Sequence, residues 1–508
     1  MEAPHAIIKK ARRIQAHVSK KLSPLAKRIW RLLNQSYEFI LFRSDPFLVQ
    51  LCYLIAISCA GFVALKSLRP KDEANRAEDL DLLFMAISAS TVSSMATMEM
   101  EDFSHPQLWV LVILMLFGGE VFTSMVGLPF TWARLNRESE RTDAAVCIDV
   151  DDEATDTEQL KHDAVRYLGY VVLGYTMIIH FSSFVLISLY LSLVSDARDV
   201  LKRKGFGVLF FSIFLSVSSF ANCGFTPTDE NMINFKKNSA LLLLVIPLVL
   251  SGNTLFPSCL RSVVWLLQKL TGKEEFSYVL QHPEAIRYGH LFPRTRCIYL
   301  AFTVAVFTLV QLLLLLCSQE WSSEIFDGMS SYQRAVAALF QSVNSRHAGE
   351  SVVDVSKLSP AILVVYVVMM YLPPYTCFVP GEGDAWPGTD TKGRRRRFWW
   401  SLHLSLLCYP VIFIILVCIT ERKSLAADPV NFNVFNVGFE VISAYANVGF
   451  SVGYSCSRLL KPESRCRDAS YGFAGRWSNK GKLITVAVML LGRLKKFQME
   501  GGKAWKFG

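Results

Sequence analysis

The sequence is poor in charged residues and is dominated by long apolar runs. Only 19% of its 508 residues are charged, 52% are hydrophobic, and the mean hydropathy is +0.32. These values exclude an ordinary soluble protein. Several apolar runs reach the roughly 20 residues that cross a hydrocarbon core of ~30 Å. We therefore expect an integral membrane protein.

Signals for secretion, for a resident metal and for nucleic acid are also missing. Residues 1–44 are basic and interrupted, so no cleavable signal peptide is expected. The twelve cysteines show no CxxC or Cys/His spacing of a metal site, and no cofactor is expected. The net charge of +10 includes a basic amino terminus, which indicates a cytoplasmic position and not nucleic-acid binding. An amphipathic helix on anionic lipid and a solvated basic tail both fit this segment.

Four short polar stretches lie between long apolar runs, at residues 91–97, 220–226, 346–351 and 445–451. The second and fourth share Ala-Asn, one residue, Gly-Phe and a hydroxyl residue, which marks an internal repeat. Non-helical backbone at membrane depth is tolerated only inside protein or along a water-filled path. Four such stretches therefore predict one shared ion filter, whose anchors are Ser94, Gly224, Gly349 and Gly449.

The expected fold is an all-α polytopic membrane protein with four repeated M1–pore loop–M2 units, where M1 and M2 are the two spans of a unit. Eight transmembrane helices would surround a single central pore, with both termini cytoplasmic. The basic loop with Arg198 and Lys202 then lies outside, against the positive-inside rule. The expected segments are a basic amino terminus (1–44), unit A (45–134), a loosely ordered acidic loop (135–163), unit B (164–268), a linker (269–296), unit C (297–380), a basic linker (381–397), unit D (398–497) and the carboxyl terminus (498–508).

Several residues around the filter have expected roles. Asn222 and Asn447, two residues before their glycines, should hold the loops by side-chain hydrogen bonds. Acids follow each of the first three stretches, and their recurrence favours cation steering at the outer mouth, although any one alone fits a solvated surface. These acids are Glu99, Glu101, Asp102, Asp229, Glu230, Glu350 and Asp354.

Three further features lie outside the filter stretches. Pro373 and Pro374 should unwind the M2 of unit C and form a gate, because two prolines remove two amide donors. Arg493 fits either a snorkelling residue at the inner interface or a fixed charge beside the ion path. Cys456 and Cys466 share one polar loop, which predicts an extracellular disulfide.

The motifs resemble those of the plant HKT transporters in the Trk/Ktr/HKT superfamily. The resemblance lies in the filter stretches and in Asn344-Ser345-Arg346-His347, Tyr371-Leu372-Pro373-Pro374-Tyr375, Gly252-Asn253-Thr254-Leu255-Phe256-Pro257 and Tyr471-Gly472-Phe473-Ala474-Gly475-Arg476-Trp477. It implies a plasma-membrane homodimer with one pore in each subunit, and it maps the family's M2 arginine onto Arg493. Serine at the first filter position resembles the sodium-selective class, whose members retrieve Na+ from xylem sap and support salt tolerance. The implied substrate is Na+, which binds at the filter. Membrane lipid surrounds the protein.

Two alternative functions remain at this point. A K+ or Na+/K+ symporter would share the fold, and a polytopic membrane enzyme would need a nucleophile, base or metal set that the spans do not show. Ser94 distinguishes the ions in our interpretation, because serine disfavours positive φ and would turn one set of carbonyl groups away from the axis, which harms K+ more than Na+. Alternatively, Ser94 is a spacer whose hydroxyl caps the pore helix.

Overall fold

The computed structural model describes residues 46–72, 77–129, 131–132, 152–286, 288–317, 324–346, 348–377, 408–459, 466 and 468–498. One compact unit comprises Leu51–Lys506, and of a second unit, residues 1–50 with 507–508, only residues 46–50 are described. The expected basic amino terminus, most of the acidic loop, the basic linker 381–397 and most of the carboxyl terminus lie outside the described residues.

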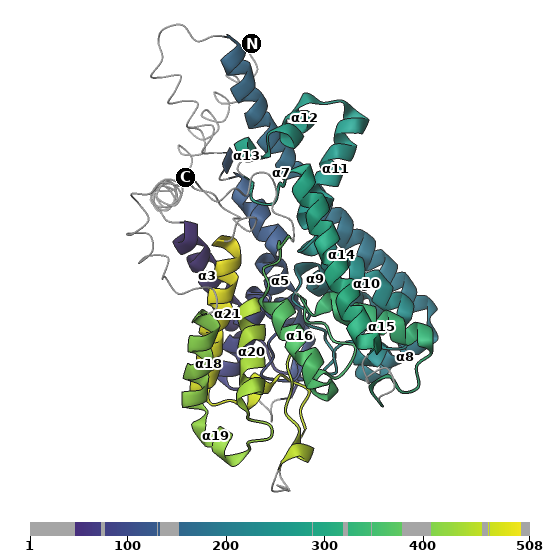
Figure 1. The fold of residues 1–508 in the computed structure, drawn as a ribbon, viewed down its shortest axis with the longest axis vertical. Helices are drawn as coiled ribbons and strands as arrows, with labels where there is room; N and C mark the ends of the chain where they lie inside the picture. The colour runs from purple at the N-terminus through teal and green to yellow at the C-terminus, as the bar shows by residue number, and fades with distance from the viewer. Residues whose placement is uncertain are drawn as a thin grey trace. The chain divides into compact units, whose positions relative to one another are not determined.

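The described chain is almost entirely helical and repeats one pattern four times (Figure 1). The first helices of the four units are α3 (Pro46–Ser67), α7 (Asp152–Leu193), α14 (Arg294–Cys317) and α18 (Cys408–Thr420). The short pore helices are α4 (Asp79–Ser90), α9 (Val208–Ala221), α15 (Ser331–Asn344) and α20 (Val434–Ala446). The fold is therefore the all-α arrangement of M1, pore loop and M2 that the sequence predicts.

The second helices differ among the units. They are α5 (His105–Gly118) followed by the helix Glu120–Pro129, α10 (Ser239–Gly252) followed by α11 (Phe256–Thr271), α16 (Pro360–Tyr371), and α21 (Asn479–Gln498). The sequence predicted a second span in each of the first two units, and the structure divides each of these into two helices. The chain bends by 57° between α5 and the next helix, and by 85° between α10 and α11. Glycine pairs or glycine with asparagine at these points allow the bend, while apolar residues on both sides hide it from a hydropathy pattern.

Membrane-spanning capacity agrees with this architecture. Within the described residues, three single helices are long and apolar enough to cross a membrane, and three bent pairs pass the same test together. One of these pairs is α8 (Ser195–Lys204) with the pore helix α9, bent by 94°, as expected for a chain that enters and leaves on one side. The remaining helices are α12 (Glu274–Gln281), α13 (Pro283–Ile286) and α19 (Arg422–Ala427).

Helix starts follow local capping chemistry. Ser104 and Gln107 form a capping box at the start of α5, and Ser330 and Gln333 form another at α15. Such pairs satisfy amide groups that have no partner inside the first turn. Asn433 accepts a hydrogen bond from the Asn436 amide at the start of α20. These three helices therefore begin at positions that their own sequences define.

The acidic segment before α7 departs from the sequence expectation. Residues 135–163 were expected to be loosely ordered, but α7 already begins at Asp152 and continues without a break to Leu193. The expectation is therefore wrong for 152–163. Good helix formers among these residues, such as Ala154, Leu160 and Lys161, can extend the helix beyond the span.

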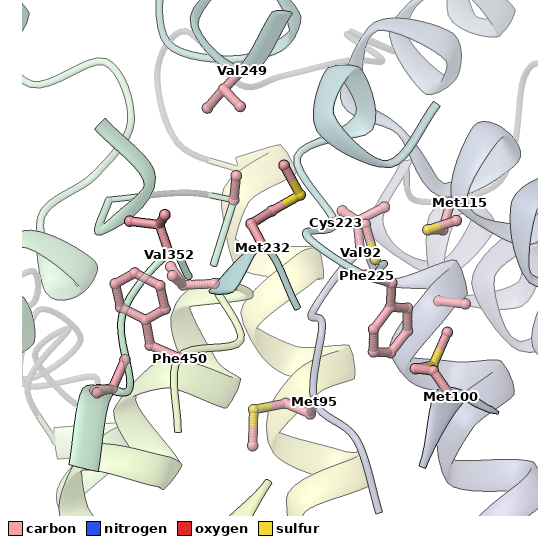
Figure 2. Close-up of a cluster of buried hydrophobic side chains, with 14 of the residues drawn as sticks. Val92, Met95, Met100, Met115, Cys223, Phe225, Met232, Val249, Val352 and Phe450 are labelled. Atoms are coloured by element: carbon pink, nitrogen blue, oxygen red, sulfur yellow. The ribbon is translucent and has the colours of Figure 1, made fainter. Parts of the chain in front are cut away.

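The core joins all four units through one large apolar cluster. Pore helices α4, α9, α15 and α20 each bury most of their residues in it. Figure 2 shows part of this cluster, including Met95, Phe225 and Phe450, the residues that follow three of the four filter anchors. In Figure 1, α20 lies beside α18 and α21 in the fourth unit, and α9 packs on α5 of the first unit and α7 of its own. The pore helices thus hold the polar loops within a shell of apolar side chains.

Candidate ion pathway

Each filter anchor has a left-handed backbone. The φ angles are 54° at Ser94, 81° at Gly224, 70° at Gly349 and 96° at Gly449. The expectation that serine would avoid this conformation is wrong, because Ser94 shares the sign of φ with the three glycines. Serine in this region is strained by roughly 1 kcal/mol relative to glycine, so surrounding contacts must hold it there.

The filter anchors also pack against one another's loops, and a Cβ added to any of the three glycines would overlap a neighbouring unit. The overlapped atoms are the Ala348 carbonyl for Gly224, the Val448 carbonyl for Gly349, and the Ser94 side chain for Gly449. The second loop therefore touches the third, the third touches the fourth, and the fourth touches the first. We call these four loops the filter ring. Backbone contacts this close explain why three positions are glycine.

Two asparagines connect the filter ring to the M2 helices. Asn222 donates from Nδ2 to the Val249 carbonyl on α10 at 3.0 Å, and Asn447 donates to the Met489 carbonyl on α21 at 3.0 Å. Asn447 also donates to Ser93 Oγ in the first loop at 2.7 Å. Both asparagines are buried and have positive φ. This geometry is what the predicted supporting role requires.

Three M2 glycines make a contact that the sequence reasoning did not identify. Each lies against the carbonyl group near the end of its own pore helix, and an added Cβ would overlap that oxygen. The pairs are Gly118 with Ser90, Gly252 with Phe220, and Gly492 with Tyr445. The available signal was a glycine at the corresponding point of three M2 segments. The contact fixes the depth of the pore helix against M2.

An open cavity of about 610 Å³ lies on one side of the filter ring. Residues from all four loops line it, including Ser94, Gly349 and Gly449. We call this cavity the outer vestibule, and the opposite side of the ring the inner side. Its acidic lining residues are Glu99, Asp229, Glu230, Asp354, Glu440 and Asp468, and its basic lining residues are Lys357 and Arg458.

The expected outer-mouth acids do not all reach this vestibule. Glu99, Asp229, Glu230 and Asp354 line it, whereas Glu101 and Asp102 lie beside it in the same loop segment and are not lining residues. Glu350 is a correction: its side chain is fully buried behind the filter ring, where Oε1 accepts a 2.5 Å hydrogen bond from Ser219. The residues after the other three anchors, Met95, Phe225 and Phe450, are buried as well, so a side chain directly after an anchor points into the packed shell.

Lys204, at the end of α8, joins two outer acids. Its Nζ lies 2.7 Å from Glu101 Oε1 and 2.7 Å from Glu230 Oε1. This pairing gives the basic residues of α8 a local reason to lie on the vestibule side, despite the positive-inside rule. Asp229 next to this group accepts a 2.9 Å hydrogen bond from the Glu101 amide. Burial and the neighbouring carboxylates raise the Asp229 pKa to about 7.

Glu440 is a vestibule acid that the sequence reasoning missed. It lies in the pore helix α20, its side chain is buried, and Oε1 accepts a 3.0 Å hydrogen bond from the Ala474 amide. The segment 472–477 is thereby fixed over the filter. A single acid among Phe439, Val441 and Ile442 was the available signal, since an unpaired carboxylate is costly at an apolar helix position.

Arg493 lies inside the protein on the inner side. Its side chain is 1% exposed, and Nη2 donates a 2.5 Å hydrogen bond to the Gly118 carbonyl at the break in the first M2. A snorkelling residue at a lipid interface would be exposed, so that alternative does not fit. The position agrees with a fixed charge near the path, and its effect on conduction stays a prediction.

Helix α16 ends just before Pro373 and Pro374, as expected because proline has no backbone amide hydrogen to donate. The helix ends at Tyr371, and the Pro373 and Pro374 carbonyls accept hydrogen bonds from Arg346 at 2.7 Å and 3.3 Å. Arg346 belongs to the third filter loop, so the unwound segment is linked directly to the ring. Whether this segment is a gate stays a prediction.

Cys456 and Cys466 form a disulfide, with Cα atoms 5.9 Å apart. Cys456 begins a short 3-10 turn beside residues that line the vestibule. The described residues contain no group of three or more His, Cys, Asp or Glu side chains arranged to hold a metal ion.

Known proteins are similar to this chain in sequence. The family described as TrkH, cation transport protein, matches residues 47–377. The chain is 50% identical to "Cation transporter HKT1;3" of Oryza sativa subsp. japonica, over 98% of each protein. It is 45% identical to "Sodium transporter HKT1" of Arabidopsis thaliana, over 87% of this chain and 91% of the relative.

A solved structure supports the fold. The potassium transporter TrkH from Vibrio parahaemolyticus superposes with a TM-score of 0.52 at 16% identity, covering 89% of this chain and 83% of that chain. Identity at this level supports the architecture alone.

Proposed function

Because the chain belongs to the TrkH family of cation transport proteins and is a relative of the HKT cation transporters, we propose that it is a sodium-selective transporter. It would move Na+ down its electrochemical gradient across the plasma membrane, with both termini in the cytoplasm. The observation that carries this proposal is the composition of the filter ring. One of its anchors is serine and three are glycine, and all four have a positive φ.

The physical basis for selectivity is steric and chemical. Ser94 keeps the φ of the glycines, so the backbone does not explain a difference between the ions. Its side chain, however, lies directly against Gly449. The other three anchors are glycines, which have only a hydrogen atom at the corresponding position. A Cβ and a hydroxyl reduce the room for a large, easily dehydrated K+, while Na+ can keep part of its water shell or use the hydroxyl as a ligand.

A role in the plant follows from the same resemblance. A sodium transporter of this kind in cells beside the xylem would retrieve Na+ from the sap and support salt tolerance. The proposed assembly is a homodimer in which each subunit has its own pore. A relative 45% identical to this chain carries the name sodium transporter, which supports Na+ as the substrate.

A second function, K+ or Na+/K+ symport, is favoured by one observation. The four anchors share a positive φ, so a set of carbonyl groups suited to K+ could still surround the axis. Relatives named sodium transporter and potassium transporter both match this chain, and we expect the side chain at position 94 to decide between the two functions.

Reversal potentials in mixed Na+ and K+ solutions test the proposal. The wild type should follow the Na+ gradient, and Ser94→Gly should shift toward the K+ gradient by increasing relative K+ permeability about tenfold, the effect of roughly 1.4 kcal/mol at the filter. Ser93→Gly is the comparison variant: it leaves position 94 unchanged but removes the hydrogen bond that Ser93 Oγ accepts from Asn447, so it measures what a loss of loop support alone does to selectivity. Equal responses of wild type and Ser94→Gly as K+ replaces Na+ would reject Ser94 as the selectivity residue.

A further inference from the structure

A second polar group lies on the inner side, away from the filter ring. It consists of Glu120, His290 and Tyr375, with exposed fractions of 3%, 0% and 8%. Glu120 is the first residue after the break in the first M2, His290 lies between α13 and α14, and Tyr375 follows the double proline. We call these three residues the inner node. It joins the first unit, the linker between the second and third units, and the end of the third unit.

The hydrogen bonds of the node define its proton positions. Tyr375 Oη donates to Glu120 Oε1 at 2.8 Å and lies 3.2 Å from His290 Nδ1. Because the single hydroxyl proton is used toward Glu120, His290 must donate from Nδ1 to Tyr375. His290 Nε2 then carries a lone pair. It lies 4.0 Å from Glu120 Oε1 and has no hydrogen-bond partner among the described residues.

The node restrains the unwound segment 373–375 at one end. At the other end, Arg346 of the third filter loop donates to the Pro373 and Pro374 carbonyls. The segment is therefore stretched between the filter ring and the break in the first M2. At that same break, the Gly118 carbonyl binds Arg493. A change at Glu120 would thus reach the backbone directly below the filter.

The charges around His290 oppose each other in the present arrangement. Full burial lowers the pKa of His290 below its ordinary value. Of the nearby charges, Glu120 favours a charged imidazole, whereas Arg493 on α21 disfavours it. Its other neighbours are the uncharged rings of Tyr288 in its own segment, Phe256 on α11 and Tyr375. A proton added to Nε2 would create a charged N–H facing Glu120 Oε1, which is the acceptor of the Tyr375 hydroxyl.

We propose that Tyr375 and Glu120 are positioning residues that hold segment 373–375 in the conducting arrangement, and that a proton on His290 draws Glu120 away from Tyr375. Acid on the inner side therefore lowers the cation current. This inference rests on the proposed transport function. A packed tyrosine without this role could be replaced by phenylalanine, which has the same ring and fills the same space, without changing transport.

Whole-cell recordings with controlled internal pH test the node. Tyr375→Phe should reduce the inward Na+ current about tenfold at neutral internal pH, the effect of losing a hydrogen bond to a charged group. The reversal potential should not change. The current should no longer respond when internal pH is lowered stepwise below 6.5, the range in which a buried histidine with a lowered pKa takes up its proton. His290→Gln keeps a hydrogen-bond donor but has no titrating group, so the current of this variant at acid internal pH should equal its own current at neutral internal pH.

Tyr371→Phe is the matched control, because Tyr371 ends α16 and contacts Lys495 through its ring, which phenylalanine retains. It should behave as wild type. Surface amounts are compared by an extracellular epitope tag. If Tyr375→Phe fails to reach the surface, the pH profile of His290→Gln decides the question.

Two outcomes would overturn the inference: a Tyr375→Phe current equal to wild type at equal surface amount, or acid inhibition that persists in His290→Gln. A wild type that reaches the surface but carries no cation current would instead reject the proposed function. The two failures are therefore distinguishable.

Discussion

The outer and inner sides of the filter ring are built in opposite ways. The outer vestibule is an open cavity in which carboxylates from several loops share one space. On the inner side, polar groups are buried and held by specific hydrogen bonds, as Arg493 binds the Gly118 carbonyl and Tyr375 binds Glu120. Diffuse charge in water gives graded effects, whereas a buried hydrogen bond is either made or lost. Substitutions should therefore change transport gradually outside and abruptly inside.

The largest effect is expected for Gly252→Ala, which tests the close contact between M2 and the pore helix of the second unit. The added methyl group would overlap the Phe220 carbonyl, so pore helix and M2 cannot keep their contact. We expect a destabilisation of about 3 kcal/mol and little protein at the cell surface, measured by surface labelling. Gly174→Ala on α7 is the control, because nothing lies within 4 Å of an added Cβ. Normal surface amount and current in Gly252→Ala would show that the packing can yield.

The next largest effect is expected for Arg493→Gln. The substitution removes a buried charge and the hydrogen bond to the Gly118 carbonyl, so the barrier for every cation should change. We expect a roughly tenfold lower Na+ current with an unchanged reversal potential. Arg493→Lys keeps the charge and should retain part of the current. A wild-type current in Arg493→Gln would remove this residue from the ion path.

A smaller, graded effect is expected at Asp229. Its pKa of about 7 lies above the ordinary value of 3.8, so the folded protein binds this proton more tightly than the unfolded chain. The resulting stabilisation is present below pH 3.8 and is lost as pH rises through 7. The carboxylate is charged above pH 7 and neutral below it, so external acid removes one attracting charge from the vestibule.

Current measured against external pH at low Na+ therefore checks Asp229. Acidification should lower the wild-type current about twofold, and Asp229→Asn should start at the lower level and respond less. Asp354→Asn, which alters another vestibule acid, should keep the pH response. A pH profile of Asp229→Asn identical to wild type would exclude this residue as the titrating group.

The smallest effect on transport is expected for the disulfide. Cys456→Ser with Cys466→Ser should lower the free energy of unfolding by about 2–3 kcal/mol, because the closed loop is short. The Na+ current per surface molecule should change little, since the cysteines lie outside the filter ring. Thermal unfolding of purified protein with and without reductant measures the first quantity. A selectivity change in the double variant would show that this loop shapes the filter.

Hydrophobic pattern and repeats could predict the four units, the pore helices and the anchors. They could not predict the bend after Gly118, because both halves of that M2 are apolar and a bend leaves no trace in hydropathy. They also misplaced Glu350, whose direction depends on the backbone at Gly349. At Ser94, intrinsic preference gave the wrong conformation, since contacts with the neighbouring loop outweigh a cost of roughly 1 kcal/mol.

The inner node was hidden for a related reason. Glu120, His290 and Tyr375 lie in three different segments, separated by 170 residues between the first two and by 85 between the last two. Nothing local relates them, and only the folding of the linker between the second and third units brings them together. Residues 269–296 were expected to be only a linker, whereas the structure buries Phe276, Val279 and Ile286 from this segment.

The four filter loops belong to a single polypeptide, and this has a consequence for how selectivity can evolve. In a channel assembled from four identical chains, one codon change alters every position around the axis at once. Here a codon change at Ser94 alters one position and leaves the three glycines intact. Ion preference can therefore change in small heritable steps. Each step is exposed to selection while the pore, with its three unchanged loops, still conducts.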